Sequence, residues 1–211
     1  MAKPVFINKK IKNFNKKIKI SGDKSLSIRW ALIASQATGK SKAYNLLNSE
    51  DILSTIKCLK KLGVKIIIKK KYCEIIGFGL NNFKYKKNLT LNAGNSGTLG
   101  RLILGLLIHY PHKVKLIGDK SLSKRDFTRV INPLKGFGAN FYQSKKSSLP
   151  LYIQGTKYVR PIKYFETRGS AQCKSSIMLA ALNTPGKTII KAKKSRDHTE
   201  ILFKQLKIPI K

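Results

Sequence analysis

The chain has 211 residues, of which 42% are hydrophobic, so it can form a full core and is neither disordered nor fibrous. Its 44 Lys and Arg residues against 9 Asp and Glu give a net charge of +35. Such a charge favours nucleic acid, anionic membranes or acidic small molecules as partners. Only seven of the cations are Arg, and the Lys residues are spread along the whole sequence, which is not the pattern of a nucleic-acid-binding stripe.

The cysteines and histidines give no sign of a disulfide framework or a metal site. Cys58, Cys73 and Cys173 are an odd number without CxxC spacing, and the three histidines add no ligand pattern. Free thiols are typical of a reducing compartment. The N-terminus lacks the apolar stretch of a signal peptide, and the longest apolar run, 102–108, is too short to span a membrane. We therefore expect a cytoplasmic protein without metal or membrane association.

The first third of the chain alternates strand and helix patterns. The predicted elements are a strand ending near residue 20, a helix at 24–37, a strand at 43–47, a helix at 49–62 and a hairpin at 64–76. Gly39 lies in a Gly-Lys-Ser sequence but lacks the second glycine of a phosphate loop. We therefore interpret Gly39 as the glycine that ends the first helix.

The same order of elements occurs twice more. The second round has a strand at 89–91, helices at 99–108 and 126–134 and a strand at 114–117 between them; the third has strands at 162–165 and 188–191 and helices at 170–182 and 195–206. Evenly spaced residues start the helices: Ser25, Ser96 and Ser170 the first ones, and Asp51, Asp126 and Asp197 the second ones. Residues 22–27 recur at 118–123 out of phase with this spacing, and we interpret the second copy as a loop.

This repetition predicts an α/β fold of three strand-helix-strand-helix-strand-strand units, at about 18–77, 88–155 and 161–211, around a pseudo-three-fold axis. Such an axis brings the N-termini of the three first helices to one end. They carry Lys24, Ser25 and Arg29, then Asn95, Ser96 and Gly97, then Ser170 and Gln172. Because helix N-termini offer free N–H groups and a positive dipole end, we expect an anion pocket there.

Five motifs, in this order, resemble those of the 5-enolpyruvylshikimate-3-phosphate synthase (3-phosphoshikimate 1-carboxyvinyltransferase) family. They are the segments 22–29 (GDKSLSIR), 92–101 (NAGNSGTLGR), 121–125 (SLSKR), 170–175 (SAQCKS) and 195–200 (SRDHTE). The resemblance implies one domain, 1–211, of the inside-out α/β barrel of enolpyruvyl transferases. It also implies transfer of the enolpyruvyl group of phosphoenolpyruvate to the 5-hydroxyl of shikimate 3-phosphate, with release of phosphate and without a cofactor.

The motifs also imply which residues bind the two substrates. For shikimate 3-phosphate these are Lys24, Ser25, Arg29, Ser170, Ala171, Gln172 and Arg196. For phosphoenolpyruvate they are Lys24, Gly97, Arg125 and Gln172. Lys24 is the implied electrostatic catalyst, and Asn95, Arg101 and Ser195 are further candidates beside the motifs. Both substrates are polyanions, and a glycine at position 97 lets the backbone approach a small ligand closely.

The sequence departs from the family chiefly in length. Family members are about twice as long, and their two domains close on the substrates. The carboxylates that they use for proton transfer lie in the half that this sequence does not match. We therefore expect a shikimate-3-phosphate-binding half that does not turn over alone, either monomeric or paired with a separately encoded second half. Asp126 stands where the family usually has proline after Arg125, and we interpret Arg168 as a solvent-facing cation.

Two alternatives stay open. A non-catalytic basic protein that binds anions or nucleic acid would explain the charge, but it predicts Arg interleaved with aromatic residues or a known binding motif. The sequence shows neither. UDP-N-acetylglucosamine enolpyruvyl transferases share the expected fold, but they would have Lys-Asn in place of Lys24-Ser25 and a reactive cysteine in a loop of the second unit.

Overall fold

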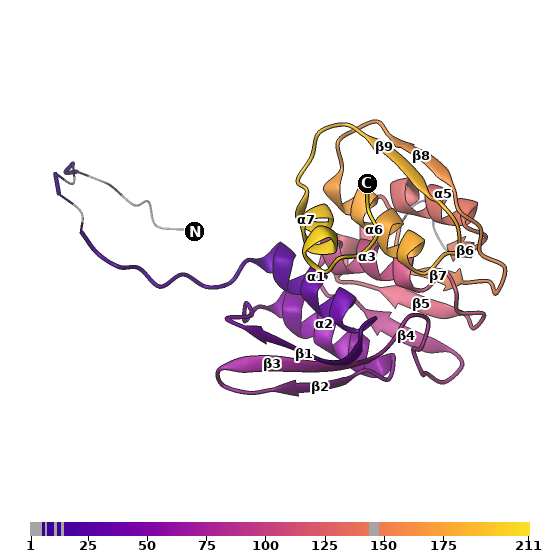
Figure 1. The fold of residues 1–211 in the computed structure, drawn as a ribbon, viewed down its shortest axis with the longest axis horizontal. Coiled ribbons are helices and arrows are strands. Elements are labelled where there is room, and N and C mark those ends of the chain that lie inside the picture. The colour runs from indigo at the N-terminus through magenta and orange to yellow at the C-terminus, as the bar shows by residue number, and fades with distance from the viewer. Residues whose placement is uncertain (1–5, 7, 11, 14, 144–147) are drawn as a thin grey trace.

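The computed structural model describes residues 6, 8–10, 12–13, 15–143 and 148–211 (Figure 1). The helices are α1 (Lys24–Ala34), α2 (Glu50–Lys61), α3 (Gly97–Leu106), α4 (Lys120–Ser123), α5 (Thr128–Gly136), α6 (Ala171–Leu182) and α7 (His198–Gln205). The strands are β1 (Thr38–Tyr44), β2 (Lys65–Ile68), β3 (Tyr72–Phe78), β4 (Leu89–Asn92), β5 (Val114–Ile117), β6 (Asn140–Gln143), β7 (Leu151–Gln154), β8 (Lys163–Glu166) and β9 (Ile189–Ala192). The mixed α/β class predicted from the sequence is confirmed. None of the described helices has the length and hydropathy of a membrane span.

The strands form three separate sheets. The first has the order β1-β3-β2 with antiparallel pairs, and the second has the order β4-β5-β7-β6, in which only β4 and β5 are parallel. The third consists of the parallel pair β8 and β9. Figure 1 shows these sheets on three sides of a central group of helices. Because one face of each sheet packs on helices, strands such as β5 and β7 alternate buried and half-buried residues.

The elements follow one another in a similar order in each part of the chain. Helix α1 leads to β1, α3 leads to β5, and α6 leads to β9. A second helix comes next: α2 and α5 each lead to an antiparallel hairpin, β2–β3 and β6–β7, and α7 comes last. The helices α1, α3 and α6 therefore occupy corresponding places in the chain, as do α2, α5 and α7.

The core lies between α1, α3 and α6. Helix α3 is almost entirely buried, and its Leu99, Leu102 and Ile103 are 0% exposed. Gly105 lets α3 approach α6 closely, because a Cβ at this position would lie 2.1 Å from the carbonyl oxygen of Ser176. Burial at about 25 cal/mol per Å² of apolar surface stabilises this arrangement. The rigid packing fixes the relative positions of the three helix N-termini.

Two local predictions in the first third of the chain are wrong. Residues 15–22 form no strand, and Ile18 and Ile20 are 68% and 76% exposed. Gly39 does not end the first helix, which stops at Ala34; it lies inside β1 with a φ of +83°. A positive φ suits glycine within a strand as well as after a helix, and the sequence does not distinguish the two places.

The second copy of the repeated hexapeptide is not a loop. Asp119 Oδ1 accepts a hydrogen bond of 2.7 Å from the backbone N–H of Leu122 and so caps α4. Asp23 caps α1 in the same way, through a 2.7 Å bond from the N–H of Leu26. Identical hexapeptides therefore form identical helix starts, and the Asp N-cap explains why.

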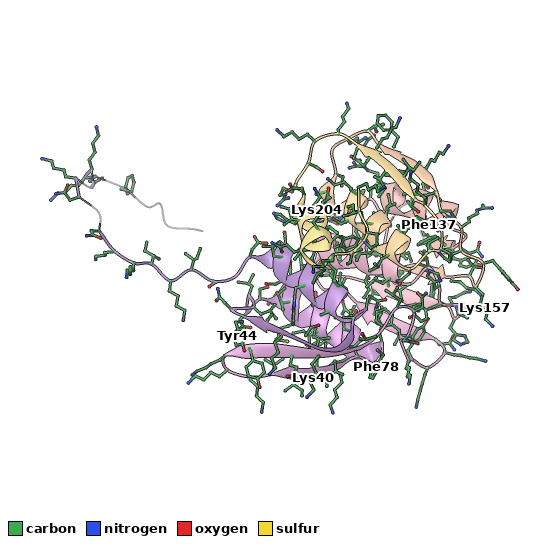
Figure 2. All side chains as sticks on the ribbon, in the orientation of Figure 1. Lys40, Tyr44, Phe78, Phe137, Lys157 and Lys204 are labelled. Atoms are coloured by element: carbon green, nitrogen blue, oxygen red, sulfur yellow. The ribbon has the colours of Figure 1, made fainter. Side chains whose placement is uncertain are left out.

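The positive charge is distributed over the surface. Lys40, Lys157 and Lys204 are exposed and lie on β1, after β7 and on α7 (Figure 2). Lysines spread in this way keep like charges apart. The positions of the few arginines therefore determine where several donors can hold one anion.

Candidate anion-binding site

Helix α1 begins with the cation and hydroxyl predicted to bind an anion. Asp23 caps the helix, so Lys24 and Ser25 lie in its first turn. The Nζ atom of Lys24 lies 3.2 Å from Oδ2 of Asp51, at the start of α2, while 55% of the Lys24 side chain remains exposed. An ammonium group has three donors, so Lys24 can contact Asp51 and an anion at the same time.

Arg29, one turn further along α1, is only 3% exposed. Its Nε donates to Thr199 Oγ1 at 2.8 Å, Nη2 donates to Ser175 Oγ at 3.0 Å, and Nη1 donates to the carbonyl of Ser25 at 3.1 Å. Burial lowers the pKa of Arg29, and the nearby charge of Arg196 lowers it further. The guanidinium thus links α1 to α6 and α7 from inside the protein.

The N-terminus of α3 is lined by two arginines. Ser96 caps this helix by accepting a 3.2 Å bond from the N–H of Leu99. Gly97 follows, and a Cβ there would lie 2.8 Å from Nη1 of Arg101 and 2.9 Å from Nη1 of Arg125. The absence of a side chain at position 97 therefore lets two guanidinium groups converge on the first turn of α3.

Arg101 and Arg125 differ in how firmly they are held. Arg101 donates to the carbonyls of Gly97 (3.2 Å) and Asp126 (3.1 Å) and lies over the ring of Phe127. Burial lowers its pKa. Arg125 lies between α4 and α5, is exposed, and makes one long bond, of 3.4 Å, to Oδ1 of Asn95. Arg125 is therefore the more available of the two for a ligand.

Helix α6 supplies the third N-terminus. Ser170 caps it through a 3.3 Å bond from the N–H of Cys173, and its own N–H donates to Glu166 Oε2 at 2.7 Å. Ala171 and Gln172 are half-buried in the first turn. Gln172 joins α6 to α3, because its Oε1 accepts from Arg101 at 3.1 Å and its Nε2 donates to Thr98 Oγ1 at 3.0 Å.

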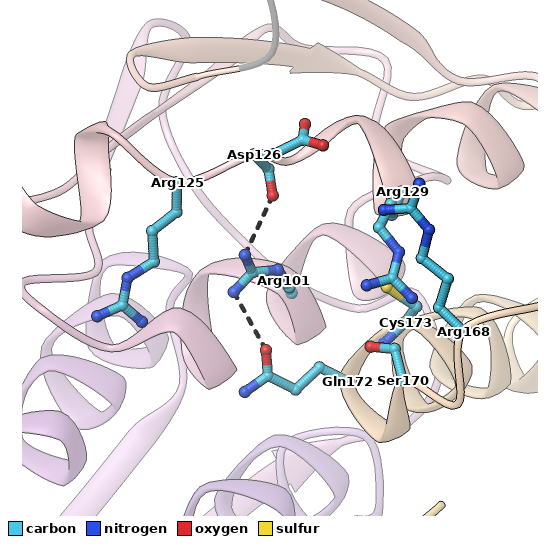
Figure 3. Close-up of a pocket in the computed structure, with 8 residues that line it drawn as sticks. All are labelled: Arg101, Arg125, Asp126, Arg129, Arg168, Ser170, Gln172 and Cys173. Atoms are coloured by element: carbon cyan, nitrogen blue, oxygen red, sulfur yellow. Dashed lines mark hydrogen bonds between the residues drawn. The ribbon is translucent and has the colours of Figure 1, made fainter. Parts of the chain in front are cut away.

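A pocket of about 320 Å³ lies beside the N-termini of α3 and α6 (Figure 3). Its lining is made of Arg101, Arg125, Asp126, Arg129, Arg168, Ser170, Gln172 and Cys173. Figure 3 shows the arginine side chains around the hollow, with Arg101 held between Asp126 and Gln172. Four guanidinium groups line the pocket against one carboxylate, that of Asp126, and this excess of positive charge favours an anion there.

The predicted site residues thus fall into two groups that meet at α6. Arg101, Arg125, Ser170 and Gln172 line the pocket, with Gly97 between the two arginines. The lining does not include Lys24, Ser25, Arg29, Ala171, Arg196, Asn95 or Ser195. Arg29 and Arg196 form the second group, near the start of α7, and Lys24 and Ser25 belong to it through α1.

Ser195 and Arg196 precede α7 and differ in their access to a ligand. Arg196 is exposed. The Oγ atom of Ser195 is buried and has no hydrogen-bond partner among the described residues. A buried hydroxyl without a partner is costly, so Ser195 gains from any ligand atom that reaches it.

Two arginines of the pocket were not predicted to belong to a site. Arg129 forms an ion pair with Glu166, which is 2% exposed. Burial alone would raise the pKa of Glu166, but bonds from Ser170 and Arg129 outweigh it and lower the pKa. Arg168 is exposed, as expected, but it faces the pocket. The sequence signal that could have assigned Arg168 to the site is its position two residues before Ser170.

No group of His, Cys, Asp or Glu that could hold a metal occurs among the residues that the model describes. The three cysteines are free and buried. Burial raises the pKa of Cys58 to about 11, so this thiol is neutral near pH 7 and unsuited to nucleophilic attack. The arrangement offers binding of anions by Arg, Lys, hydroxyl and helix N–H groups.

Fold and site together define a mixed α/β protein with a cationic pocket beside the N-termini of two helices, an arrangement that can hold an anion. The chain belongs to the EPSP synthase (3-phosphoshikimate 1-carboxyvinyltransferase) family, whose model matches residues 8–211.

Similar proteins of known sequence and structure agree with this membership. The 3-phosphoshikimate 1-carboxyvinyltransferase of Streptococcus pyogenes serotype M1 is 42% identical over 190 residues, which are 89% of this chain and 44% of that protein. The protein of the same name from Caldicellulosiruptor saccharolyticus is 43% identical over 89% of this chain and 43% of its own length. A solved EPSP synthase from Acinetobacter baumannii superimposes with a TM-score of 0.84 and 34% identity, over 90% of this chain and 43% of that one. The chain thus spans less than half the length of these relatives.

Proposed function

We propose that this chain is the shikimate-3-phosphate-binding half of an enzyme that transfers the enolpyruvyl group of phosphoenolpyruvate to the 5-hydroxyl of shikimate 3-phosphate and releases phosphate. The observation that carries the proposal is the convergence of the family's motif residues on the N-termini of α1, α3 and α6. Ser96 and Ser170 cap α3 and α6 with hydroxyl groups, α1 carries Ser25 in its first turn, and Lys and Arg side chains lie beside these ends, which suits two polyanionic substrates.

For shikimate 3-phosphate we assign Lys24, Ser25, Arg29, Ser170, Ala171, Gln172 and Arg196, with Ser195 beside them. The exposed guanidinium of Arg196 and the ammonium of Lys24 are available for the phosphate group. Arg29 is enclosed by Thr199 and Ser175, so its contribution is the positioning of α1 against α6 and α7 and the positive potential that it adds.

For phosphoenolpyruvate we assign Lys24, Gly97, Arg125 and Gln172, with Arg101 and Asn95 in support. Arg125 is exposed at the pocket and can form a bidentate pair with a carboxylate or phosphate. Arg101 donates to two backbone carbonyls and to Oε1 of Gln172, so it orients Gln172. Cations placed around the leaving phosphate would stabilise the charge that develops there. The motifs assign Lys24 to both substrates, so we give this role to Lys24.

Proton transfer is assigned to the remainder of the enzyme. Several acids near the site are already engaged: Asp51 with Lys24, Glu166 with Arg129, and Asp119 with Asn95. Residues 1–211 would then form one domain of an inside-out α/β barrel, with units of about 18–77, 88–155 and 161–211 around a pseudo-three-fold axis. We expect a cytoplasmic chain, monomeric or joined to a separately encoded second half, with no cofactor and no specific nucleic acid.

The test is calorimetric titration of shikimate 3-phosphate into the full chain at moderate salt, with shikimate as the control ligand. We expect saturable binding that needs the phosphate and that Arg196→Ala weakens at least about tenfold, which is 1.4 kcal/mol. Lys204→Ala removes an exposed cation at the far end of α7 and should leave the affinity unchanged. Equal binding of shikimate, or an equal loss in both variants together with a steep salt dependence, would instead indicate a non-specific polyanion binder.

A further inference from the structure

A buried carboxylate organises the turn that leads from β8 into α6. Glu166, the last residue of β8, is 2% exposed. Its Oε2 accepts a 2.7 Å hydrogen bond from the backbone N–H of Ser170, and its Oε1 accepts from the guanidinium of Arg129. Burial alone would raise the pKa of this carboxyl, but the N–H groups of Ser170 and Arg168 and the side chain of Arg129 lower it. Glu166 is therefore ionised near pH 7 and attracts N–H groups of the turn that follows it.

This turn has little freedom to move. Gly169 has a φ of +68°, and a Cβ there would lie 3.0 Å from the carbonyl oxygen of Lys194. The carbonyl of Glu166 accepts a 3.1 Å bond from the N–H of Lys193, which follows β9. Backbone bonds and close packing therefore fix the position from which the side chain of Arg168 starts.

From this turn, Arg168 extends into the lining of the pocket. Figure 3 shows it with Arg129 on one side of the hollow, while Arg125 lies on the other side. Arg101 donates to three acceptors, Arg129 is paired with Glu166, and Arg125 has one long bond. The exposed guanidinium of Arg168 makes no hydrogen bond or ion pair with any residue that the structure describes. All its donors are thus free for a ligand.

The charges around Arg168 favour an anion beside it. Among the described residues that line the pocket, the one carboxylate is that of Asp126, whose Oδ1 already accepts a 2.7 Å bond from the N–H of Thr128. Glu166 lies behind the lining and is paired with Arg129. Two acids thus stand against four guanidinium groups, and neither of them pairs with the side chain of Arg168.

We propose that Arg168 is a ligand-binding residue of this pocket and that Glu166 is the residue that positions it. Arg168 donates to a carboxylate or phosphate oxygen of the bound molecule, from the side opposite Arg125. The motif resemblance includes neither Glu166 nor Arg168. The identity of the ligand as phosphoenolpyruvate rests on the proposed function, whereas the role of Arg168 rests on the pocket itself.

The shape of the pocket suits a small ligand with two anionic groups. Its volume of about 320 Å³ is at the small end of the range for ligand sites. Because Arg125 and Arg168 lie on opposite sides, one group of the ligand can face each of them. A guanidinium can bind a carboxylate or a phosphate through two parallel hydrogen bonds, so each side offers oriented binding and not charge alone.

The experiment labels the arginine side chains of the full chain with phenylglyoxal and measures each site by peptide mass spectrometry. The probes are inorganic phosphate alone and phosphoenolpyruvate added in the presence of shikimate 3-phosphate. At saturation each probe should slow the labelling of Arg168 at least about tenfold, because a bound anion covers the guanidinium. Arg160 is exposed and lies outside the pocket lining, so its labelling should not change.

The two probes separate this inference from the proposed function. Protection of Arg168 by either probe supports the inference. Protection by phosphate but not by phosphoenolpyruvate would support Arg168 as an anion-binding residue and count against the proposed substrate. Protection of Arg125 without Arg168, or of neither residue by either probe, would overturn the inference.

A matched pair of variants tests the same role through affinity. Arg168→Gln should weaken the binding of both probes about tenfold, because it removes the bidentate donor. Lys163→Gln removes an equal charge from the exposed start of β8 and should change the affinity less than about twofold. Equal losses in the two variants would assign the effect to overall charge and contradict a specific contact by Arg168.

The positioning role of Glu166 has a separate readout. Glu166→Gln keeps an acceptor for the N–H of Ser170 but loses the charge that holds the turn. We expect phosphate to protect Arg125 but no longer Arg168 in this variant. Gly169→Ala strains the same turn at its positive φ and should have the same effect, which keeps the role testable if Glu166→Gln does not fold. If the folded variants had a lower unfolding temperature but kept the protection of Arg168, Glu166 would be a structural residue and not a positioning one.

Discussion

Arg29 and Arg125 carry the same side chain and belong to the same resemblance, yet the fold places them in opposite environments. Arg29 is 3% exposed and shares its donors among Thr199, Ser175 and the carbonyl of Ser25. Arg125 is exposed beside the pocket and has one long bond to Asn95. A guanidinium whose donors are used inside the protein holds elements together, whereas one with free donors is ready for a ligand.

The difference arises from the elements around each residue. Arg29 lies in the middle of α1, where α6 and α7 cover it, and its charge is tolerated because hydroxyl and carbonyl oxygens surround it. Arg125 lies in the short link between α4 and α5, which runs over the surface. The motif resemblance assigns both residues to the site, whereas the structure buries Arg29 and exposes Arg125.

The largest expected effect is the loss of folding stability in Arg29→Ala. The substitution removes three hydrogen bonds from a charged donor and leaves a buried space between α1, α6 and α7. We expect the free energy of unfolding to fall by about 3 kcal/mol, since hydrogen bonds to charged groups contribute about 1.5–3 kcal/mol each and part of the loss is recovered by relaxation. Urea denaturation followed by circular dichroism measures it.

Arg125→Ala is the matched control for this comparison. We expect its free energy of unfolding to stay within about 0.5 kcal/mol of the original chain, because surface substitutions away from special features cost little. If Arg29→Ala were as stable as Arg125→Ala and lost only affinity for shikimate 3-phosphate, Arg29 would be a ligand contact and not a positioning residue.

The second-largest effect is expected from Gly97→Ala, which fills the space beside Arg125. In Gly97→Ala the new Cβ would lie 2.8 and 2.9 Å from the Nη1 atoms of Arg101 and Arg125, so both side chains must move. Gly97 has no positive φ and opens α3, where Ala is the better helix former. We expect stability unchanged or higher by up to about 1 kcal/mol, while affinity for phosphoenolpyruvate falls about tenfold.

Titration calorimetry with phosphoenolpyruvate in the presence of shikimate 3-phosphate reads out this change, and thermal unfolding gives the stability. Gly100→Ala serves as the control in the same helix, since its Cβ would meet only ordinary contacts of 3.4 Å and more, to Phe127 and Ala93. A loss of affinity in both variants, or in neither, would contradict a specific role for the space at position 97.

Much of the fold could be predicted from the sequence, because apolar periodicity and helix-start residues are local signals. Helices starting near Lys24, Gly97 and Ala171 were predicted and are confirmed. The strand near residue 20 was not found: this segment pairs with no strand among the described residues, and both isoleucines are exposed. Strand formation depends on tertiary partners that the sequence does not display.

The candidate site was predictable only as a set of residue types. Gly97, Arg125 and Gln172 come from motifs far apart in the sequence, and only the fold shows that Gln172 bridges α3 and α6 through Thr98 and Arg101. The burial of Arg29 could not be predicted, because it results from α7, the last helix of the chain, packing over α1. Side-chain environments follow from long-range packing, whereas motifs record only identity.

The smallest effect concerns Lys24, whose environment is intermediate between those of Arg29 and Arg125. Its side chain is half exposed and forms an ion pair with Asp51. In Asp51→Asn the ion pair is lost, but exposed pairs contribute only about 0–1 kcal/mol, so stability should change little. The carboxylate of Asp51 also offsets part of the positive charge that Lys24 offers to a bound phosphate, so its neutralisation should tighten shikimate 3-phosphate by about threefold at low salt, less at high salt. Glu50→Gln, one residue earlier on α2, changes the net charge equally and should have no such effect. Equal tightening in both variants would assign the gain to overall charge, and weaker binding in Asp51→Asn would show that Asp51 holds Lys24 in the binding position.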